Sequence, residues 1–239
     1  LFGTLIILIN VPVVYLFIVN KPSDINQIPD GEEIKDNSED NLGVDWTIRD
    51  LLKDRNFWIL SLVFAIQFCS MMGILSHLTF FSEGAGWSQA WGAFIFSMYA
   101  WPAMFSKVFF GWLVENKIDA RLAVSIAVLI QAIATLLMIF VESPEQMVVL
   151  VMIFGFGGGS ALPLSNILFN QAYTNKSFGK ARGAAQPFIS IFQISGTLVA
   201  ARMFDVFGNY ELAFLTLGFI LIVPLIAIWF LKEEPKLAS

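Results

Sequence analysis

The sequence predicts an all-α integral membrane protein with seven membrane-spanning helices, and three observations predict it. First, 57% of the 239 residues are hydrophobic and only 14% are charged, whereas soluble domains average about 25% charged residues. Second, seven stretches are mostly apolar over about 20 residues, the length that crosses a bilayer as a helix. Third, the chain has too few polar residues to cover seven such helices in water.

The seven apolar stretches follow one another through short connections, except after the first. They lie at 1–20, 57–82, 90–113, 122–141, 147–170, 183–204 and 211–231. The chain begins on Leu1, already inside an apolar stretch and without an initiator Met. We therefore expect a fragment of a larger protein: one helix, a linker at 21–56, a six-helix block at 57–231, and a tail at 232–239.

The linker 21–56 carries the acidity of the chain. It holds ten acidic and five basic residues, and ten minus five accounts for the whole net charge of −5. Its first part, with Pro22, Pro29 and Gly31, is typical of flexible chain. Its last part predicts a short helix over 46–55, capped by Asp45, at the membrane interface. The acidity therefore describes one connection and says nothing about a substrate.

Lysine and arginine gather in alternate connections, which predicts the orientation of the helices. Twelve of the fourteen bases lie in the linker, in the connections after the third and fifth stretches, and in the tail. Connections rich in these residues face the cytoplasm. We therefore expect a cytoplasmic linker and tail, in a multi-pass protein of a bacterial inner membrane.

Composition and motifs exclude several classes of function. Cys69 is the single cysteine, so a disulfide framework and a cysteine zinc site are excluded. The chain has no basic cluster to bind nucleic acid. It also lacks a histidine-rich metal cluster, a Gly-x-Ser-x-Gly motif and paired carboxylates within the apolar stretches, so we expect no enzyme, no cofactor and no metal.

Two bases lie within the apolar stretches, Lys107 and Arg202. Arg202 is near the end of its stretch and can reach the headgroups. At about 100° per residue, Lys107 shares one side of the helix 90–113 with small residues, while most bulky aromatic residues lie opposite. We predict that Lys107 faces the inside of the protein, where an ionisable group is a candidate for binding substrate or a coupling ion. A structural ion pair or snorkelling is the alternative.

His77, the only histidine, lies on a stripe with Ser70 and Gly73. One interpretation is a hydrogen-bonded structural residue. The other is a residue that lines a cavity and responds to pH, because the pKa of an ordinary histidine lies near neutrality.

Two further stripes carry amide side chains. Gln186 and Gln193 lie on one face of the stretch 183–204, which either packs against a neighbouring helix or lines a water-filled path. Asn166 shares a face of its stretch with Gly155 and Gly159, whose spacing is chiefly a signal for close helix packing.

Prolines recur inside the apolar stretches. Each removes a backbone hydrogen bond and can kink its helix. They are Pro12, Pro102, Pro163, Pro187 and Pro224.

One helix, a long linker and six closely spaced helices form the pattern of the back half of a twelve-helix transporter. Segment 111–121 resembles the cytoplasmic loop signature of the major facilitator superfamily, with Glu115 for its usual aspartate and Asn116 for its usual base. Segments 178–183 and 204–214 resemble the stretches that flank its eleventh helix. The resemblance covers about 46–231 and is closest to the branch containing the monocarboxylate transporters and the oxalate/formate exchangers.

In that branch the eighth helix carries a basic residue, four positions before a glycine, that contacts the substrate carboxylate. Lys107 and Gly111 match this spacing. The monocarboxylate transporters also carry an aspartate, four positions before the base, that is tied to proton coupling, and Ala103 stands there in this chain. The resemblance implies that Lys107 attracts the carboxylate, and a single base suggests a substrate with one negative charge.

We therefore expect the C-terminal six-helix half of a secondary active transporter that moves a small organic anion, a monocarboxylate, by alternating access. Its partners would be the missing N-terminal half of the same protein, the lipid bilayer, and a proton or counter-anion. Two alternatives remain: a membrane receptor or sensor with transporter ancestry, and an exporter of a neutral or cationic solute. The expected site consists of Lys107, His77, Gln186, Gln193 and Asn166.

Overall fold

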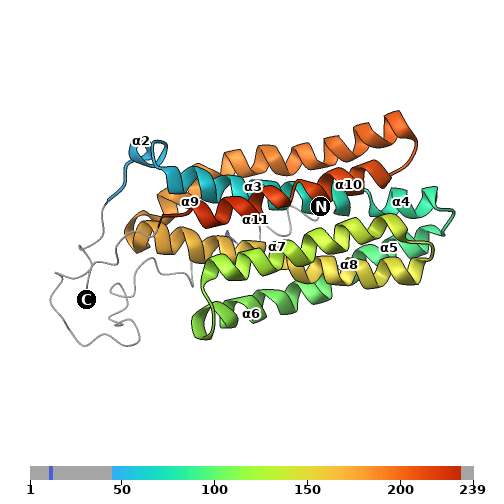
Figure 1. The fold of residues 1–239 in the computed structure, drawn as a ribbon, viewed down its shortest axis with the longest axis horizontal. Coiled ribbons are helices and arrows are strands. Elements are labelled where there is room, and N and C mark those ends of the chain that lie inside the picture. The colour runs from blue at the N-terminus through green and yellow to red at the C-terminus, as the bar shows by residue number, and fades with distance from the viewer. Residues whose placement is uncertain (1–10, 13–44, 233–239) are drawn as a thin grey trace. The chain divides into compact units, whose positions relative to one another are not determined.

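The computed structural model describes residues 11–12 and 45–232. Most of the predicted first helix at 1–20, most of the linker and most of the tail therefore lie outside the described residues. Every described element is helical (Figure 1). Their order is α2 (Ile48–Leu51), α3 (Arg55–Leu75), α4 (Leu78–Gly84), α5 (Gln89–Met98), α6 (Ala100–Asn116), α7 (Ala120–Leu137), η2 (Met138–Phe140), α8 (Pro144–Gly159), α9 (Ala161–Phe207), α10 (Glu211–Phe219), α11 (Ile222–Ala227) and η3 (Ile228–Phe230).

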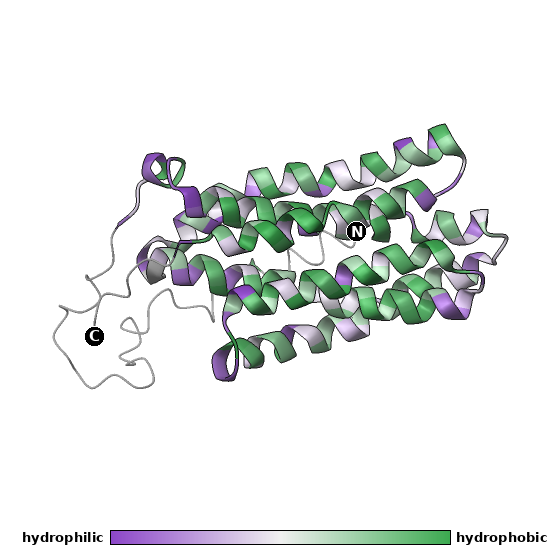
Figure 2. Ribbon diagram, in the orientation of Figure 1, coloured by the Kyte–Doolittle hydropathy of each residue, from purple (hydrophilic) through white to green (hydrophobic). Residues whose placement is uncertain are grey.

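Six segments of the described part are long and apolar enough to cross a membrane, and apolar residues run along all of them in Figure 2. They match the six stretches predicted between 57 and 231. They are Arg55–Gly84, Gln89–Asn116, Ala120–Phe140, Pro144–Tyr173, Lys176–Phe207 and Glu211–Phe230. Most extend beyond the predicted boundaries, because hydropathy marks the part of a helix suited to hydrocarbon and not the turns that continue into the headgroup region.

Three of the predicted proline kinks coincide with breaks between helices. The ring of a proline clashes with the carbonyl group four residues earlier. Pro102 lies four residues after the end of α5, and Pro163 four residues after the end of α8. Pro224 lies four residues after Ile220, the C-cap of α10. Pro187, by contrast, lies inside α9 without ending it.

Element α9 covers 47 residues but belongs to two membrane-spanning segments, of which the first ends at Tyr173 and the second begins at Lys176. A straight helix of that length would measure about 70 Å. Asn166 and Arg182 are nevertheless within hydrogen-bonding distance of each other. The run therefore folds back between them, as Figure 1 shows, and supplies the end of one span and the whole of the next, Lys176–Phe207. We refer to residues 161–173 as the first limb of α9 and to Lys176–Phe207 as the second limb.

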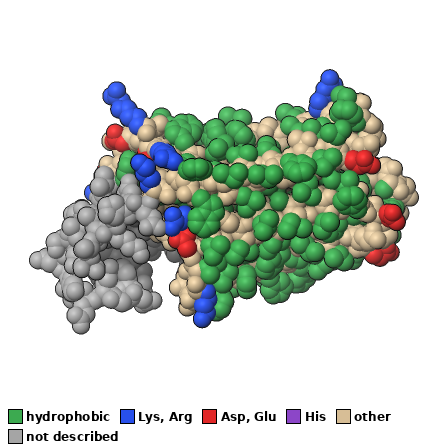
Figure 3. Space-filling model, in the orientation of Figure 1, with side chains coloured by type: hydrophobic (Ala, Val, Ile, Leu, Met, Phe, Trp, Pro, Cys, Tyr) green, Lys and Arg blue, Asp and Glu red, His purple; other side chains and the backbone are tan. Residues whose placement is uncertain are grey.

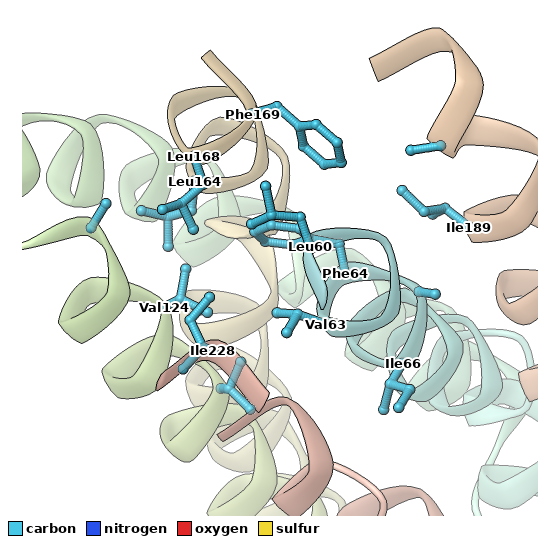
Figure 4. Close-up of a cluster of buried hydrophobic side chains, with 14 of the residues drawn as sticks. Leu60, Val63, Phe64, Ile66, Val124, Leu164, Leu168, Phe169, Ile189 and Ile228 are labelled. Carbon is cyan, nitrogen blue, oxygen red and sulfur yellow. The ribbon is translucent and has the colours of Figure 1, made fainter. Parts of the chain in front are cut away.

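Helix α3 lies at the centre of the six-helix block. In its most apolar window 72% of the residues are buried, against 22% for the span of α5 and α6 and 17% for the second limb of α9. Figure 4 shows its side chains, including Leu60, Val63 and Phe64, packed among residues of α7, α9 and η3. The block therefore leaves two of its six spans largely uncovered.

The two ends of the block differ in charge (Figure 3). One end carries nine of the eleven described lysines and arginines; we refer to it as the basic end. They are Arg49, Lys53, Arg55, Lys117, Arg121, Lys176, Lys180, Arg182 and Lys232. The opposite end carries Glu83, Glu142, Glu145, Asp205 and Glu211, with Arg202 as the base nearest to it.

The end of the linker forms a shorter helix than the predicted 46–55. Helix α2 has four residues, and the Oγ1 atom of Thr47, not the carboxylate of Asp45, accepts from the amide of Asp50 at 3.3 Å. Asp54 then caps α3 by accepting from the amide of Phe57 at 3.1 Å. Two N-caps so close together divide the predicted helix, because each cap residue has extended backbone angles.

Candidate functional site

Lys107 is exposed on the surface of the six-helix block. Helix α6 buries a different set of residues, Ala103, Ser106 and Phe110. Lys107 is four residues after Ala103, which places it about 40° further around the helix. It therefore lies at the edge of the packed face. The small residues of α6 identify the side on which a neighbouring helix approaches closely. They do not show where the packed face of α6 ends.

Helices α6 and α8 run in the same direction at close range. A methyl group added to Gly159 would lie 2.4 Å from the Cα of Ala103, and one added to Gly155 would lie 2.6 Å from the carbonyl oxygen of Tyr99. Only glycine allows this approach, so the predicted packing role of the two glycines is confirmed.

The contact between α6 and α8 also fixes the position of Asn166 relative to Lys107. Asn166 lies seven residues after Gly159, so it is on nearly the same side of its helix, and Lys107 lies four residues after Ala103. At about 1.5 Å per residue their Cα atoms differ in height by about 4.5 Å. Both side chains are exposed. Lys107 and Asn166 therefore flank the same seam, at similar depth.

Asn166 and Gln186 are brought together by Arg182, which is not among the five predicted site residues. Its Nε donates to Oδ1 of Asn166 at 3.3 Å, and Nη1 donates to Oε1 of Gln186 at 3.0 Å. The Nε2 of Gln186 in turn donates to Oγ of Ser190 at 3.3 Å. This chain of polar side chains joins the two limbs of α9. We refer to Asn166, Arg182, Gln186 and Ser190 as the polar cluster.

Arg182 has donor capacity to spare. A guanidinium has five N–H groups, and the two amide oxygens accept two of them. The guanidinium carbon also lies 5.6 Å from the centre of the Phe169 ring. Among the described residues, no carboxylate lies within ion-pair distance of Arg182 or of Lys107. Arg182 therefore combines a guanidinium that has no carboxylate partner in the described part of the chain with two neighbouring amide side chains, an arrangement suited to an anion.

His77 lies far from the polar cluster, near the opposite end of the block. It separates α3 from α4, and both of its ring nitrogens have partners. Nε2 is 3.1 Å from the carbonyl oxygen of Thr197, and Nδ1 is 3.1 Å from the hydroxyl of Tyr210. Because a carbonyl only accepts, Nε2 donates to Thr197, and Nδ1 pairs with the hydroxyl of Tyr210. This geometry supports the structural interpretation of His77.

Gln193 lies seven residues, or about two turns, beyond Gln186 on the second limb of α9. Its side chain is half-buried and makes no hydrogen bond with another described residue. The five expected residues therefore do not form one cluster: Asn166 and Gln186 are joined through Arg182, Lys107 flanks the same seam as Asn166, and His77 is elsewhere.

A sequence signal for Arg182 exists. Arg182, Gln186 and Ser190 are spaced by four residues and so share one helix face. Hydropathy places Arg182 in a connection, because apolar character begins only at 183, whereas the span begins at Lys176. For metals, no group of three or more histidine, cysteine or acidic side chains in the described part is arranged to hold an ion.

Comparison with known proteins identifies the family. The family profile described as "Major Facilitator Superfamily" matches residues 1–119 and 92–239. A solved structure, that of the POT family transporter PepTSo, is similar in fold with a TM-score of 0.62 and 18% sequence identity. The similarity covers 76% of this chain and 39% of that one, so the chain spans less than half of the transporter it resembles. No curated protein matches the sequence. The six apolar helices and the profile match show that this chain is an integral, multi-pass membrane protein and belongs to the Major Facilitator Superfamily.

Proposed function

We propose that this chain is the C-terminal half, with the preceding helix, of a secondary active transporter for a small organic anion. The observation that carries the proposal is that Lys107 and Arg182 have no carboxylate partner among the described residues and that Arg182 lies beside the amide groups of Asn166 and Gln186. An anion entering this face would supply the missing counter-charge. A monocarboxylate is the class we expect, from the match of Lys107 and Gly111 to the carboxylate-binding pattern.

Uncovered helices support a second part of the proposal, that a further half packs here. The spans of α5–α6 and of the second limb of α9 expose large apolar side chains, among them Trp101, Phe105, Ile191 and Ile194, each more than 60% exposed. The matched region of the solved transporter is likewise only part of its length. We propose that an N-terminal half faces these helices and that transport follows from rocking of the two halves, with the basic end in the cytoplasm of a bacterial cell.

Substitution of Lys107 tests the proposal in the full-length protein reconstituted in proteoliposomes. Lys107→Ala should abolish saturable uptake of labelled acetate and lactate while the amount of protein in the membrane is unchanged. Arg202→Ala is the matched control, since Arg202 is the other base within an apolar stretch and lies near the opposite end of its helix. Normal uptake by Lys107→Ala would refute the assignment of the site.

The same assay separates the alternatives. A receptor would bind the anion, detected by isothermal titration, without accumulating it inside the vesicles. An exporter of cations would move labelled tetraphenylphosphonium and be insensitive to competing acetate. Accumulation of neither acetate nor lactate by the unmodified protein would contradict the monocarboxylate assignment.

A further inference from the structure

The end of the linker, at Asp45 and Trp46, forms hydrogen bonds with residues at the bend of α9. The Oδ1 of Asp45 is 2.5 Å from the Nζ of Lys180, and the amide of Trp46 donates to the Oγ of Ser177 at 2.9 Å. Lys180 and Ser177 both belong to the second limb, just after the bend. Two consecutive linker residues therefore hold one side of the bend.

The other side of the bend is held through Tyr173, the last residue of the first limb. Its hydroxyl donates to the Oδ2 of Asp54, and its ring meets that of Trp46 edge-on with centres 5.5 Å apart. Tyr173 is 1% exposed, so these contacts are part of a packed interior. We refer to Asp45, Trp46 and Asp54 as the clasp.

The clasp contacts the bend between the two limbs of α9, and this bend sets the geometry of the polar cluster. Its contacts fall on residues 173–180, between Asn166 and Arg182 in sequence. Asn166 is two turns before Tyr173, and Arg182 is two residues after Lys180. Because both limbs are helical, the angle of the bend sets whether the Arg182 guanidinium reaches Asn166.

We propose that Asp45 and Trp46 are positioning residues, which act through the α9 bend to hold Arg182 against Asn166 and thereby set the affinity for the anion. This inference rests on the proposed function, since it assumes that Arg182 binds the substrate.

Exchange of the charges between Asp45 and Lys180 tests the clasp in the full-length protein. Asp45→Lys and Lys180→Asp should each raise the half-saturating concentration for labelled lactate about two- to five-fold, in the range that exposed ion pairs supply, with little change in the maximal rate. The double exchange should restore the half-saturating concentration to within about two-fold of the unmodified protein. Simple loss of folding would not be reversed by a second charge change.

Two further variants make the test specific. Asp50→Asn removes a carboxylate from the same segment, but Asp50 contacts Thr47 and not α9, so uptake should be unchanged. Trp46→Ala should raise the half-saturating concentration, and Trp46→Phe, which keeps a ring against Tyr173, should restore most of the affinity.

The outcomes distinguish failure of this inference from failure of the proposed function. If Arg182→Gln weakens uptake while Asp45→Lys and Trp46→Ala do not, the clasp is refuted and the anion site stands. If Arg182→Gln takes up lactate as the unmodified protein does, the clasp and the anion site are both refuted. The same holds if the unmodified protein takes up no lactate. A double exchange no better than the single variants would also overturn the clasp.

Discussion

Arg182, on the second limb of α9, donates a hydrogen bond to Asn166, which precedes it by sixteen residues on the first limb. In a straight helix these residues would be about 24 Å apart. The bond therefore requires the reversal of α9, and it places a guanidinium beside the seam that also holds Lys107. This single contact changes the interpretation of the site, because it adds a second cation to the one that the sequence indicated.

Asn166→Asp should inactivate the site without unfolding the protein. The new carboxylate would occupy the position of the amide oxygen that accepts from Arg182, and it would form an ion pair that competes with the substrate anion. We expect uptake of lactate to fall at least about ten-fold, the factor that corresponds to about 1.4 kcal/mol, with an unchanged or higher melting temperature. Asn116→Asp, the same change at the exposed end of α6, is the control. Equal uptake by both variants would contradict an anion site at Arg182.

Gly159→Ala should destabilise the contact between α6 and α8. The added methyl group would meet the Cα of Ala103 at 2.4 Å, and a backbone atom cannot move aside as a flexible side chain can. We expect a loss of about 1–3 kcal/mol, the usual cost of overpacking, measured by thermal unfolding in detergent. Gly183→Ala is the matched control: it lies in α9 with no atom within 4 Å of the added methyl, so better helix propensity should leave stability equal or slightly higher.

His77→Ala should lower stability without changing the half-saturating concentration for the anion. Both ring nitrogens bond to the protein, one to Thr197 and one to Tyr210, so neither is available to a substrate. We expect a loss of about 1–2 kcal/mol from the two hydrogen bonds. In a double-mutant cycle, His77→Ala should cost less when Tyr210 is already Phe. A stable variant that no longer transports would instead show that His77 binds the substrate.

Acid should remove the stabilisation that Asp119 gives to α7. Asp119 is the N-cap of that helix, and its hydrogen bond with the Arg121 side chain, followed by those from backbone amides, lowers the pKa of the carboxyl group. A group with a lower pKa in the folded state stabilises the fold above its unfolded pKa, near 3.9, and the contribution disappears as the pH falls through the folded pKa. The melting temperatures of the unmodified protein and of Asp119→Asn should therefore differ at pH 6 and converge below about pH 4. A constant difference across this range would show that charge on Asp119 contributes nothing.

Local patterns in the sequence were sufficient for much of the fold. Hydropathy located the six described spans, because a helix in lipid must be apolar over a fixed length. Three prolines located helix breaks, since the ring clashes with the carbonyl four residues earlier, whereas Pro187 lies inside α9 without ending it. The spacing of Gly155 and Gly159 predicted close packing, which the contact with Ala103 and Tyr99 confirms.

The candidate site depended on contacts that local patterns do not contain. Helical periodicity placed Lys107 with small residues but not at the exposed edge of the α6–α8 contact, because that position depends on where a neighbouring helix lies. The polarity of Gln186 indicated a stripe. Its bond to Arg182 was not predicted, because hydropathy placed the start of this span at 183, after Arg182, whereas the span begins at Lys176. The partners of His77 lie 120 and 133 residues away.

The sequence by itself determined that this chain is an α-helical membrane protein, where its spans begin and end to within a few turns, and that Lys107 is an unusual charge within one of them. Only the tertiary structure decided which polar groups share a site. The reversal of α9 joins Arg182 to Asn166, and the end of the linker is fastened across that reversal through Lys180 and Ser177. Spans follow from the local balance of apolar and polar residues, whereas a site follows from the packing of helices that are distant in the chain.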